Sequence, residues 1–159
     1  MAYIFTDEEI GLQPIATAET TAQHPLGYLR KAKDPTYGEG EFIYLKAGTA
    51  CTVGQVVNWD SSFSSAPIAT TGRGGMAFAM GTVALNSYGW YQISGIAVAK
   101  SGTVAATALV YLTAVAGTID DAVSATNKLE GALTRSTDGT PSAGFCLVQC
   151  SRPSANGNG

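Results

Sequence analysis

The residues best suited to chemistry in this chain are one histidine and two pairs of neighbouring carboxylates. His24 lies in AQHPLG, so a hydrolase of the Ser–His–Asp type would have to use it as the base. The prolines around it make a poor support for precise catalytic geometry. Glu39 and Glu41 flank Gly40 and could bind a cation or do acid–base work, although a solvated turn is the favoured interpretation. No GxSxG nucleophile elbow occurs, and the sequence predicts a protein without enzymatic activity.

The three cysteines, Cys51, Cys146 and Cys150, are predicted to be buried free thiols. Their odd number argues against a closed set of disulfides. Cys146 and Cys150 lie in a predicted strand, where a spacing of four residues places them on one face about 13 Å apart, at ~3.3 Å per residue. A disulfide requires Cα atoms within about 7 Å. One histidine and three scattered cysteines also lack the spacing of a zinc site, so no metal and no cofactor are expected.

Three aromatic residues cluster in YGWY, at Tyr88, Trp90 and Tyr91. Exposed aromatic rings on a β-scaffold can stack on sugars or pack into a protein interface. Packing of at least Trp90 in the core is the favoured interpretation.

Composition and charge limit the classes of partner. Charged residues make up 13% of the chain, about half of the usual ~25%. The net charge of −3 provides no basic surface for nucleic acid. No run of 18 apolar residues occurs, so no membrane association is expected, and the acidic start MAYIFTDEEIG does not resemble a secretory signal. The 59 residues between Asp60 and Asp120 carry only two charges, Arg73 and Lys100, which predicts that this region is buried or covered by a partner.

Short runs of β-forming residues separated by glycine turns predict a mainly β protein, a single barrel or sandwich-like domain with less than about a tenth helix. Gly95 is expected to bend one strand, and Pro153 to end the last. The β-rich domain is expected over 31–153, followed by a flexible tail over 154–159. The predicted strands cover 41–47, 53–59, 65–71, 76–85, 90–100, 108–115, 128–134 and 145–152.

The first 30 residues differ from the rest of the chain. They show no sustained period of two or 3.6, and Pro14 and Pro25 interrupt both helix and strand. They nevertheless carry several large apolar side chains, which favours an extended arm that docks on a partner or a neighbouring subunit over a solvated tail. The residues predicted to form an interface are Tyr3, Ile4, Phe5, Ile10, Leu12, Ile15, Tyr37, Trp90 and Tyr91.

Four stretches together resemble the small head decoration, or capsid cement, proteins of tailed bacteriophages. They are HPLGYLRKAKDPTYGEGEFIYLKA, YGWYQISGIAVAK, GTIDDAV and GTPSAGFCLVQCSRP, and they span residues ~23–153. The resemblance implies a β-rich module that sits on the outer surface of the capsid, bridges neighbouring major capsid proteins and is often a homotrimer. It also implies a virion protein assembled in the cytoplasm of the host bacterium.

Two other functions remain open at this stage. One is a carbohydrate- or receptor-binding module of a phage fibre or surface appendage, using Tyr88, Trp90 and Tyr91. The other is a small hydrolase using His24 or the pair Glu39 and Glu41.

Overall fold

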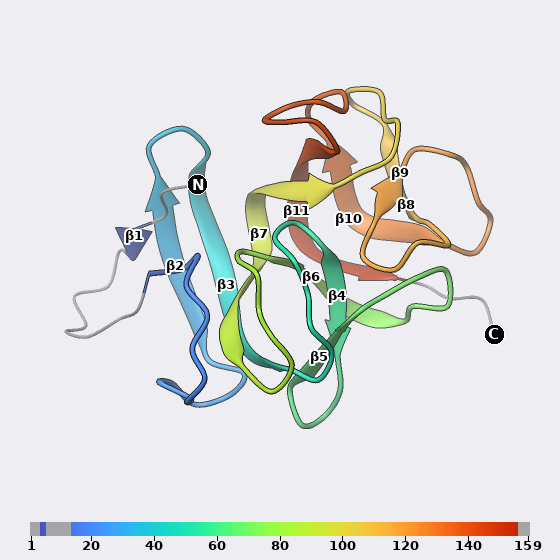
Figure 1. Ribbon diagram of the computed structural model, residues 1–159. Coiled ribbons are helices and arrows are strands. Elements are labelled where there is room, and N and C mark those ends of the chain that lie inside the picture. Colours follow the sequence, from blue (N-terminus) through green and yellow to red (C-terminus); the bar gives the residue numbers. More distant parts are fainter. Residues whose placement is uncertain (1–3, 6–13, 156–159) are drawn as a thin grey trace.

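The chain folds into strands joined by turns and loops. The computed structural model describes residues 4–5 and 14–155, and these residues form no helix (Figure 1). The strands are β1 (Ile4–Phe5), β2 (Leu29–Asp34), β3 (Gly38–Ala47), β4 (Val56–Trp59), β5 (Ser64–Pro67), β6 (Gly74–Ala79), β7 (Tyr88–Lys100), β8 (Leu109–Leu112), β9 (Ile119–Asp120), β10 (Lys128–Thr134) and β11 (Phe145–Ala155). The all-β class predicted from the glycine-punctuated pattern is confirmed.

All the strands belong to one mixed sheet in the order β1-β2-β3-β5-β4-β6-β7-β11-β10-β8-β9. Most neighbours are antiparallel, but β3 and β5 are parallel, pairing at Lys46 with Ser64 and at Ala47 with Ser65. Because β3 also pairs with β7, the pairings β3–β5–β4–β6–β7–β3 form a closed ring of five strands. A second closure joins β6 directly to the end of β11.

Strand β7 connects the five-stranded ring to the strands that follow it in the sheet, β11, β10, β8 and β9. Its first half pairs with β3, and the stretch Ser94–Lys100 pairs with β11. The bend predicted at Gly95 lies between these two halves, where the backbone has a φ of 99°. The Gln92 side-chain amide donates hydrogen bonds of 3.0 and 3.1 Å to the carbonyl oxygens of Ser94 and Ile96, so it stabilises the bend from inside the fold.

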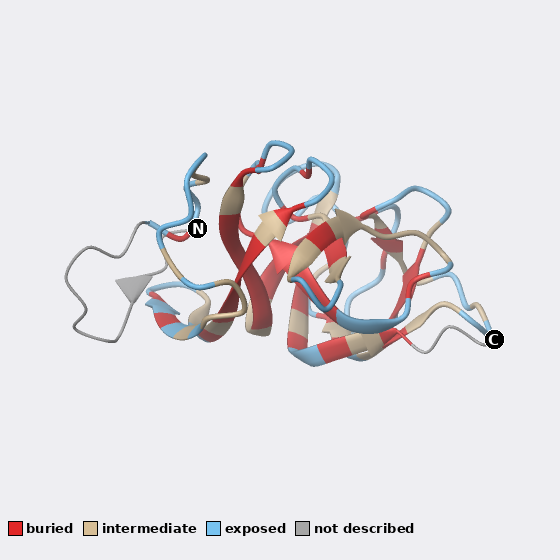
Figure 2. Cartoon of the chain, turned by 90° about the horizontal axis from the view of Figure 1, so that it is seen from below, coloured by how far each residue is buried: buried red, intermediate tan, exposed pale blue. Residues whose placement is uncertain are grey.

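The buried residues, coloured red, lie along the strands (Figure 2). Their apolar side chains fall into three clusters. One fills the five-stranded ring with alternate residues of its strands, such as Ile43, Leu45 and Tyr91. Another lies between β6, the second half of β7 and β8–β11. The third covers the other side of β3, where Phe42 and Tyr44 pack with Trp90. Because successive residues of a strand point to opposite faces, β3 and β7 are buried on both faces.

The structure corrects two predicted boundaries. Strand β11 does not end at Pro153 but continues to Ala155, and Ser154 and Ala155 pair with both β6 and β10. The predicted tail over 154–159 therefore begins two residues too early. At the other end, Leu29 and Arg30 belong to β2 and not to an arm, because both pair with β3.

Candidate functional site

The predicted arm is described only in part. Tyr3, Ile10 and Leu12 lie outside the described residues. Ile4 and Phe5 form β1, which pairs with Lys33 and Ala32 of β2. The role of these five residues in an interface remains a prediction.

Residues 14–28 pack against the molecule's own sheet. The Ile15 side chain is only 3% exposed and lies in the cluster that contains Phe42, Tyr44 and Trp90. Glu19 and Tyr88 exchange two backbone hydrogen bonds of 2.9 and 2.8 Å. The prediction that Ile15 belongs to an intermolecular interface is therefore wrong, because it completes a core of its own chain. Residues 14–28 therefore do not belong to an extended arm.

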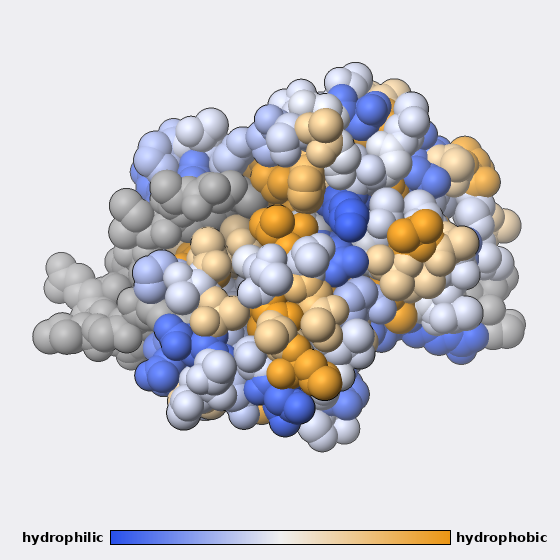
Figure 3. Space-filling model, viewed as in Figure 1, coloured by the Kyte–Doolittle hydropathy of each residue, from blue (hydrophilic) through white to orange (hydrophobic). Residues whose placement is uncertain are grey.

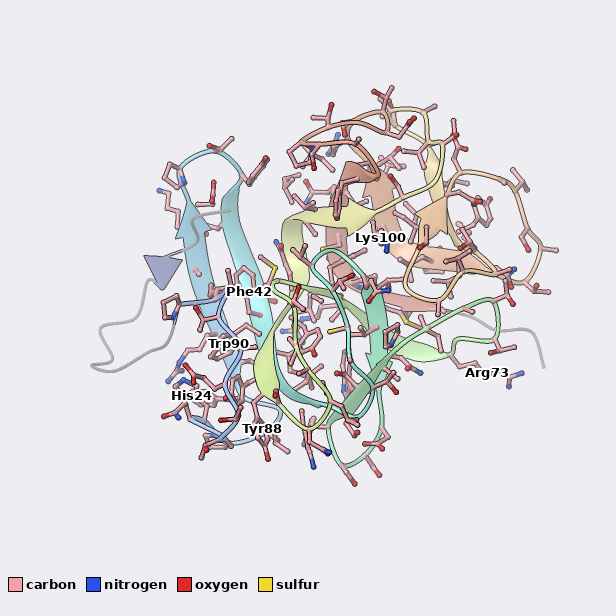
Figure 4. All side chains as sticks on the ribbon, in the orientation of Figure 1. His24, Phe42, Arg73, Tyr88, Trp90 and Lys100 are labelled. Carbon is pink, nitrogen blue, oxygen red and sulfur yellow. The ribbon has the colours of Figure 1, made fainter. Side chains whose placement is uncertain are left out.

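His24 is part of an aromatic cluster (Figure 4). Its ring lies 5.1 Å from the Tyr44 ring, 5.4 Å from the Trp90 ring and 6.0 Å from the Tyr28 ring, measured between centroids. The Arg30 guanidinium lies over the Tyr28 ring, 3.9 Å from its centre. These contacts give His24 a packing role that holds residues 14–28 on the sheet.

The aromatic residues of YGWY lie mainly in the interior. Trp90 is 1% exposed and Tyr91 is fully buried, because they occupy opposite faces of a strand that is covered on both sides. Both were predicted as interface residues, and the structure corrects this to core positions. Only Tyr88 of the three is half-buried, and its ring stacks 6.4 Å from that of Tyr44. The glycan platform proposed from Trp90 and Tyr91 is therefore not available at the surface.

Of the predicted interface residues whose burial the structure describes, Tyr37 alone reaches the surface. It is the last residue of the β2–β3 turn, where the Asp34 carboxylate accepts hydrogen bonds of 2.7 and 2.9 Å from the backbone N–H groups of Thr36 and Tyr37. Its half-buried side chain lines a cavity of about 240 Å³ together with Val53 and Phe145. An apolar side chain of a partner would fit there.

One member of the candidate carboxylate pair, Glu41, is used in ion pairing, and the other, Glu39, is exposed. Glu41 Oε2 lies 3.3 Å from Arg152 Nη2, and its other oxygen lies 4.0 Å from Lys31 Nζ. Within the described ranges, no three His, Cys, Asp or Glu side chains are grouped so as to hold a metal ion. The part of the chain that the structure describes also contains no helix long and apolar enough to cross a membrane.

The three cysteines are buried free thiols, as predicted. Burial raises the pKa of the Cys51 and Cys146 thiols, and that of Cys150 to about 12. Cys51 Sγ lies 3.4 Å from the Tyr91 hydroxyl, which lies 3.1 Å from the Ser65 hydroxyl. Burial also raises the pKa of Tyr91, so this group of side chains is neutral and stabilises the interior of the ring.

The surface contains little charge and several exposed apolar side chains. Arg73 and Lys100, the two cations of the charge-poor segment 61–119, lie apart from one another (Figure 4). Three large apolar side chains of that segment are exposed: Leu85 by 59%, Leu109 by 47% and Val115 by 65%. Figure 3 shows one face of the molecule on which strongly hydrophilic residues are scattered and neutral or hydrophobic ones fill the area between them.

No protein-family model matches the chain, and no curated protein matches it significantly.

Proposed function

We propose that this chain is a structural protein of a tailed-phage virion that binds the outer surface of the capsid and cements neighbouring major capsid proteins. In this function it acts without cofactor or enzymatic activity, as a homotrimer assembled in the host cytoplasm. The resemblance of residues ~23–153 to capsid decoration proteins suggests this function, and the nature of the surface supports it.

The observation that carries the proposal is the charge-poor segment 61–119, much of which is buried but which exposes several large apolar side chains. Leu85, Leu109 and Val115 are exposed in a stretch with two charges. Large neutral surfaces usually mark protein interfaces, and a symmetric assembly is the common way to cover them. Binding to a shell and to other copies of the chain would remove these side chains from water.

The fold is consistent with a passive structural module. We interpret the closed ring of five strands as a β-barrel. The side chains that could have taken part in catalysis have structural roles instead. His24 packs among aromatic rings, Glu41 is ion-paired and the thiols are buried. A glycan-binding role is disfavoured, since it depended on Trp90 and Tyr91.

The test is to add the full-length protein to undecorated heads built from the capsid protein encoded with it. Bound protein is measured by co-sedimentation, and its position by cryo-electron microscopy. The variants Leu85→Glu, Leu109→Glu and Val115→Glu each place a charge in the neutral surface. Val123→Glu is the matched control, because Val123 is 87% exposed and follows the acidic pair at 120–121, outside the segment.

We expect the wild type and Val123→Glu to decorate heads and at least one segment variant to bind tenfold or more weakly. A tenfold loss of affinity corresponds to about 1.4 kcal/mol, and the free-energy cost of burying a charge without a partner is far larger than that. If the wild-type protein does not bind heads, the proposed function is wrong. If all four variants bind like the wild type, the docking surface lies elsewhere.

A further inference from the structure

An apolar groove opens at one end of the five-stranded ring. At this end β4 finishes, β5 and β6 begin, the first half of β7 approaches its bend, and β3 contributes Ile43 from its middle. The groove has a volume of about 370 Å³, and its walls include Trp59, Phe63, Met76, Ile43 and Ile93. Ligand sites of proteins are mostly apolar clefts of this size or larger, and the ends of β-barrels are frequent places for them.

Two residues of the groove have unusual backbone conformations. Phe63 has a φ of 56° and Arg152 a φ of 45°, and they are two of the four non-glycine residues with positive φ in the described part of the chain. This region is unfavourable for residues with a Cβ, above all for a bulky one such as Phe63. Backbone strain of this kind concentrates at binding sites, where the surrounding structure maintains it.

The two aromatic walls rest on glycines. A Cβ atom at Gly27 would collide with the Phe63 ring, and one at Gly75 would lie 3.0 Å from Trp59 Cη2. Both rings therefore lie directly against the backbone and are fixed in place. The groove is formed before any ligand arrives, which reduces the entropic cost of binding.

The rim carries a cationic group. The Arg152 side chain is 64% exposed, and Glu41 accepts one hydrogen bond of 3.3 Å from its Nη2. Glu41 also lies 4.0 Å from Lys31 Nζ, so its charge is shared between two cations. A guanidinium has five N–H donors, and the exposure of Arg152 leaves donors available for a second carboxylate.

We propose that this groove binds a peptide segment of a partner protein in which a large apolar side chain stands next to a carboxylate. The apolar side chain enters between Trp59 and Phe63, and the carboxylate accepts hydrogen bonds from Arg152. The apolar walls and the single guanidinium on the rim of the groove are complementary to that pair of groups. The inference rests on the proposed function only in making the capsid protein the natural source of the segment.

The experiment uses intrinsic fluorescence of the full-length protein. The chain has two tryptophans, of which Trp90 is buried at 1% exposure and Trp59 lines the groove. Three capped pentapeptides are titrated to millimolar concentration: Gly-Leu-Asp-Gly-Gly, its Lys-for-Asp analogue and its Ala-for-Leu analogue. The Trp59→Phe variant verifies that the signal comes from the groove.

We expect a saturable change in emission with the Leu-Asp peptide and about tenfold weaker binding of each analogue. Arg152→Gln should bind the Leu-Asp peptide about tenfold more weakly than the wild type does. This variant should bind the Lys analogue at least as tightly as the Leu-Asp peptide. Arg135→Gln is the matched control, because Arg135 is an exposed arginine that follows β10 and does not line the groove; it should bind as the wild type does.

Three results would overturn the proposal. The first is that the Leu-Asp peptide causes no saturable change in emission. The second is that the wild-type protein binds the Lys analogue as tightly as the Leu-Asp peptide. The third is that Arg152→Gln binds the Leu-Asp peptide with unchanged affinity. A change in Trp59 emission that depends on protein concentration without peptide would assign the groove to a second copy of the chain and also overturn it. Because no heads are present, failure here leaves the head-binding test of the proposed function unaffected.

Discussion

Replacement of Phe63 should reverse the usual stability order of glycine and alanine. Phe63 ends the turn between β4 and β5, where its N–H donates a 3.0 Å hydrogen bond to the Asp60 carbonyl. The Asp60 carboxylate also accepts hydrogen bonds of 2.8 and 3.0 Å from the N–H groups of Ser62 and Ser64. These contacts fix the turn and hold Phe63 at a φ of 56°, a value that glycine adopts without strain.

The magnitude follows from two opposing terms. Both Phe63→Gly and Phe63→Ala lose the packing of the ring, so that loss cancels in the comparison. Alanine retains a left-handed strain of about 1–2 kcal/mol, whereas glycine adds about 0.4–1 kcal/mol of unfolded-state entropy. The Phe63→Gly variant should therefore be more stable than Phe63→Ala by about 1 kcal/mol, or about 0.5 M in the midpoint of urea unfolding.

The assay is equilibrium urea unfolding followed by circular dichroism. Ser62 provides the control, since it lies in the same turn and is not among the positive-φ residues. There the ordinary order should hold, with Ser62→Ala more stable than Ser62→Gly by about 0.4–1 kcal/mol. If Phe63→Ala equals or exceeds Phe63→Gly in stability, the strain assigned to this wall of the groove does not exist.

Three further predictions test other parts of the structure. The three thiols should react slowly with a thiol reagent at pH 8 in the native protein, because a raised pKa keeps them protonated, and all three should react in denaturant; fast native reaction would contradict their burial. Gly95→Ala should lower the free energy of unfolding by about 3 kcal/mol or more, because the φ of residue 95 is 99° and an added Cβ would collide with the Glu39 carbonyl oxygen. Gly139→Ala, with a φ of 91° and open space around the residue, should lower it less. Equal losses in the two variants would show that the close approach at Gly95 is unimportant. Deletion of residues 2–13 should leave the domain folded but weaken head binding, and full-length binding should depend weakly on salt if apolar anchors lead it; a collapse at high salt would point to the acidic run at 7–9 instead.

Much of the fold was predictable because local patterns determine it. Alternating and continuous runs of β-formers gave the positions of β3, β7 and β11, and the isolated Gly95 correctly marked a bend. The proline rule failed at Pro153, which lies inside β11. There the strand changes partner from β7 to β6 next to the positive φ of Arg152, so the interruption that proline usually causes coincides with a bend already present.

The surface was less predictable because burial depends on long-range closure. Trp90 and Tyr91 looked available for binding, but ring closure and the docking of residues 14–28 cover both faces of β7. The groove was missed for the same reason. Arg152 is far in the sequence from Trp59 and Phe63, and none of the three belongs to a recognisable motif. Only the pairing of β3 with β5 and of β6 with β11 brings these residues together.

The unequal lengths of the strand pairings in the five-stranded ring, short between β3 and β5, bear on how the molecule would yield under mechanical load. The ring closes there through two residue pairs, whereas β3 and β7 are joined by six. Backbone hydrogen bonds from Gly48 and Thr49 to the Ser65 carbonyl oxygen, of 2.8 and 3.1 Å, reinforce this short seam. The β6–β7 joint of the ring also has two residue pairs, so tension across the ring would open one of these two short joints and leave the β3–β7 ladder intact. If the protein binds a capsid as proposed, outward pressure on the shell would stretch it by opening a short joint of the ring, which can close again when the tension falls.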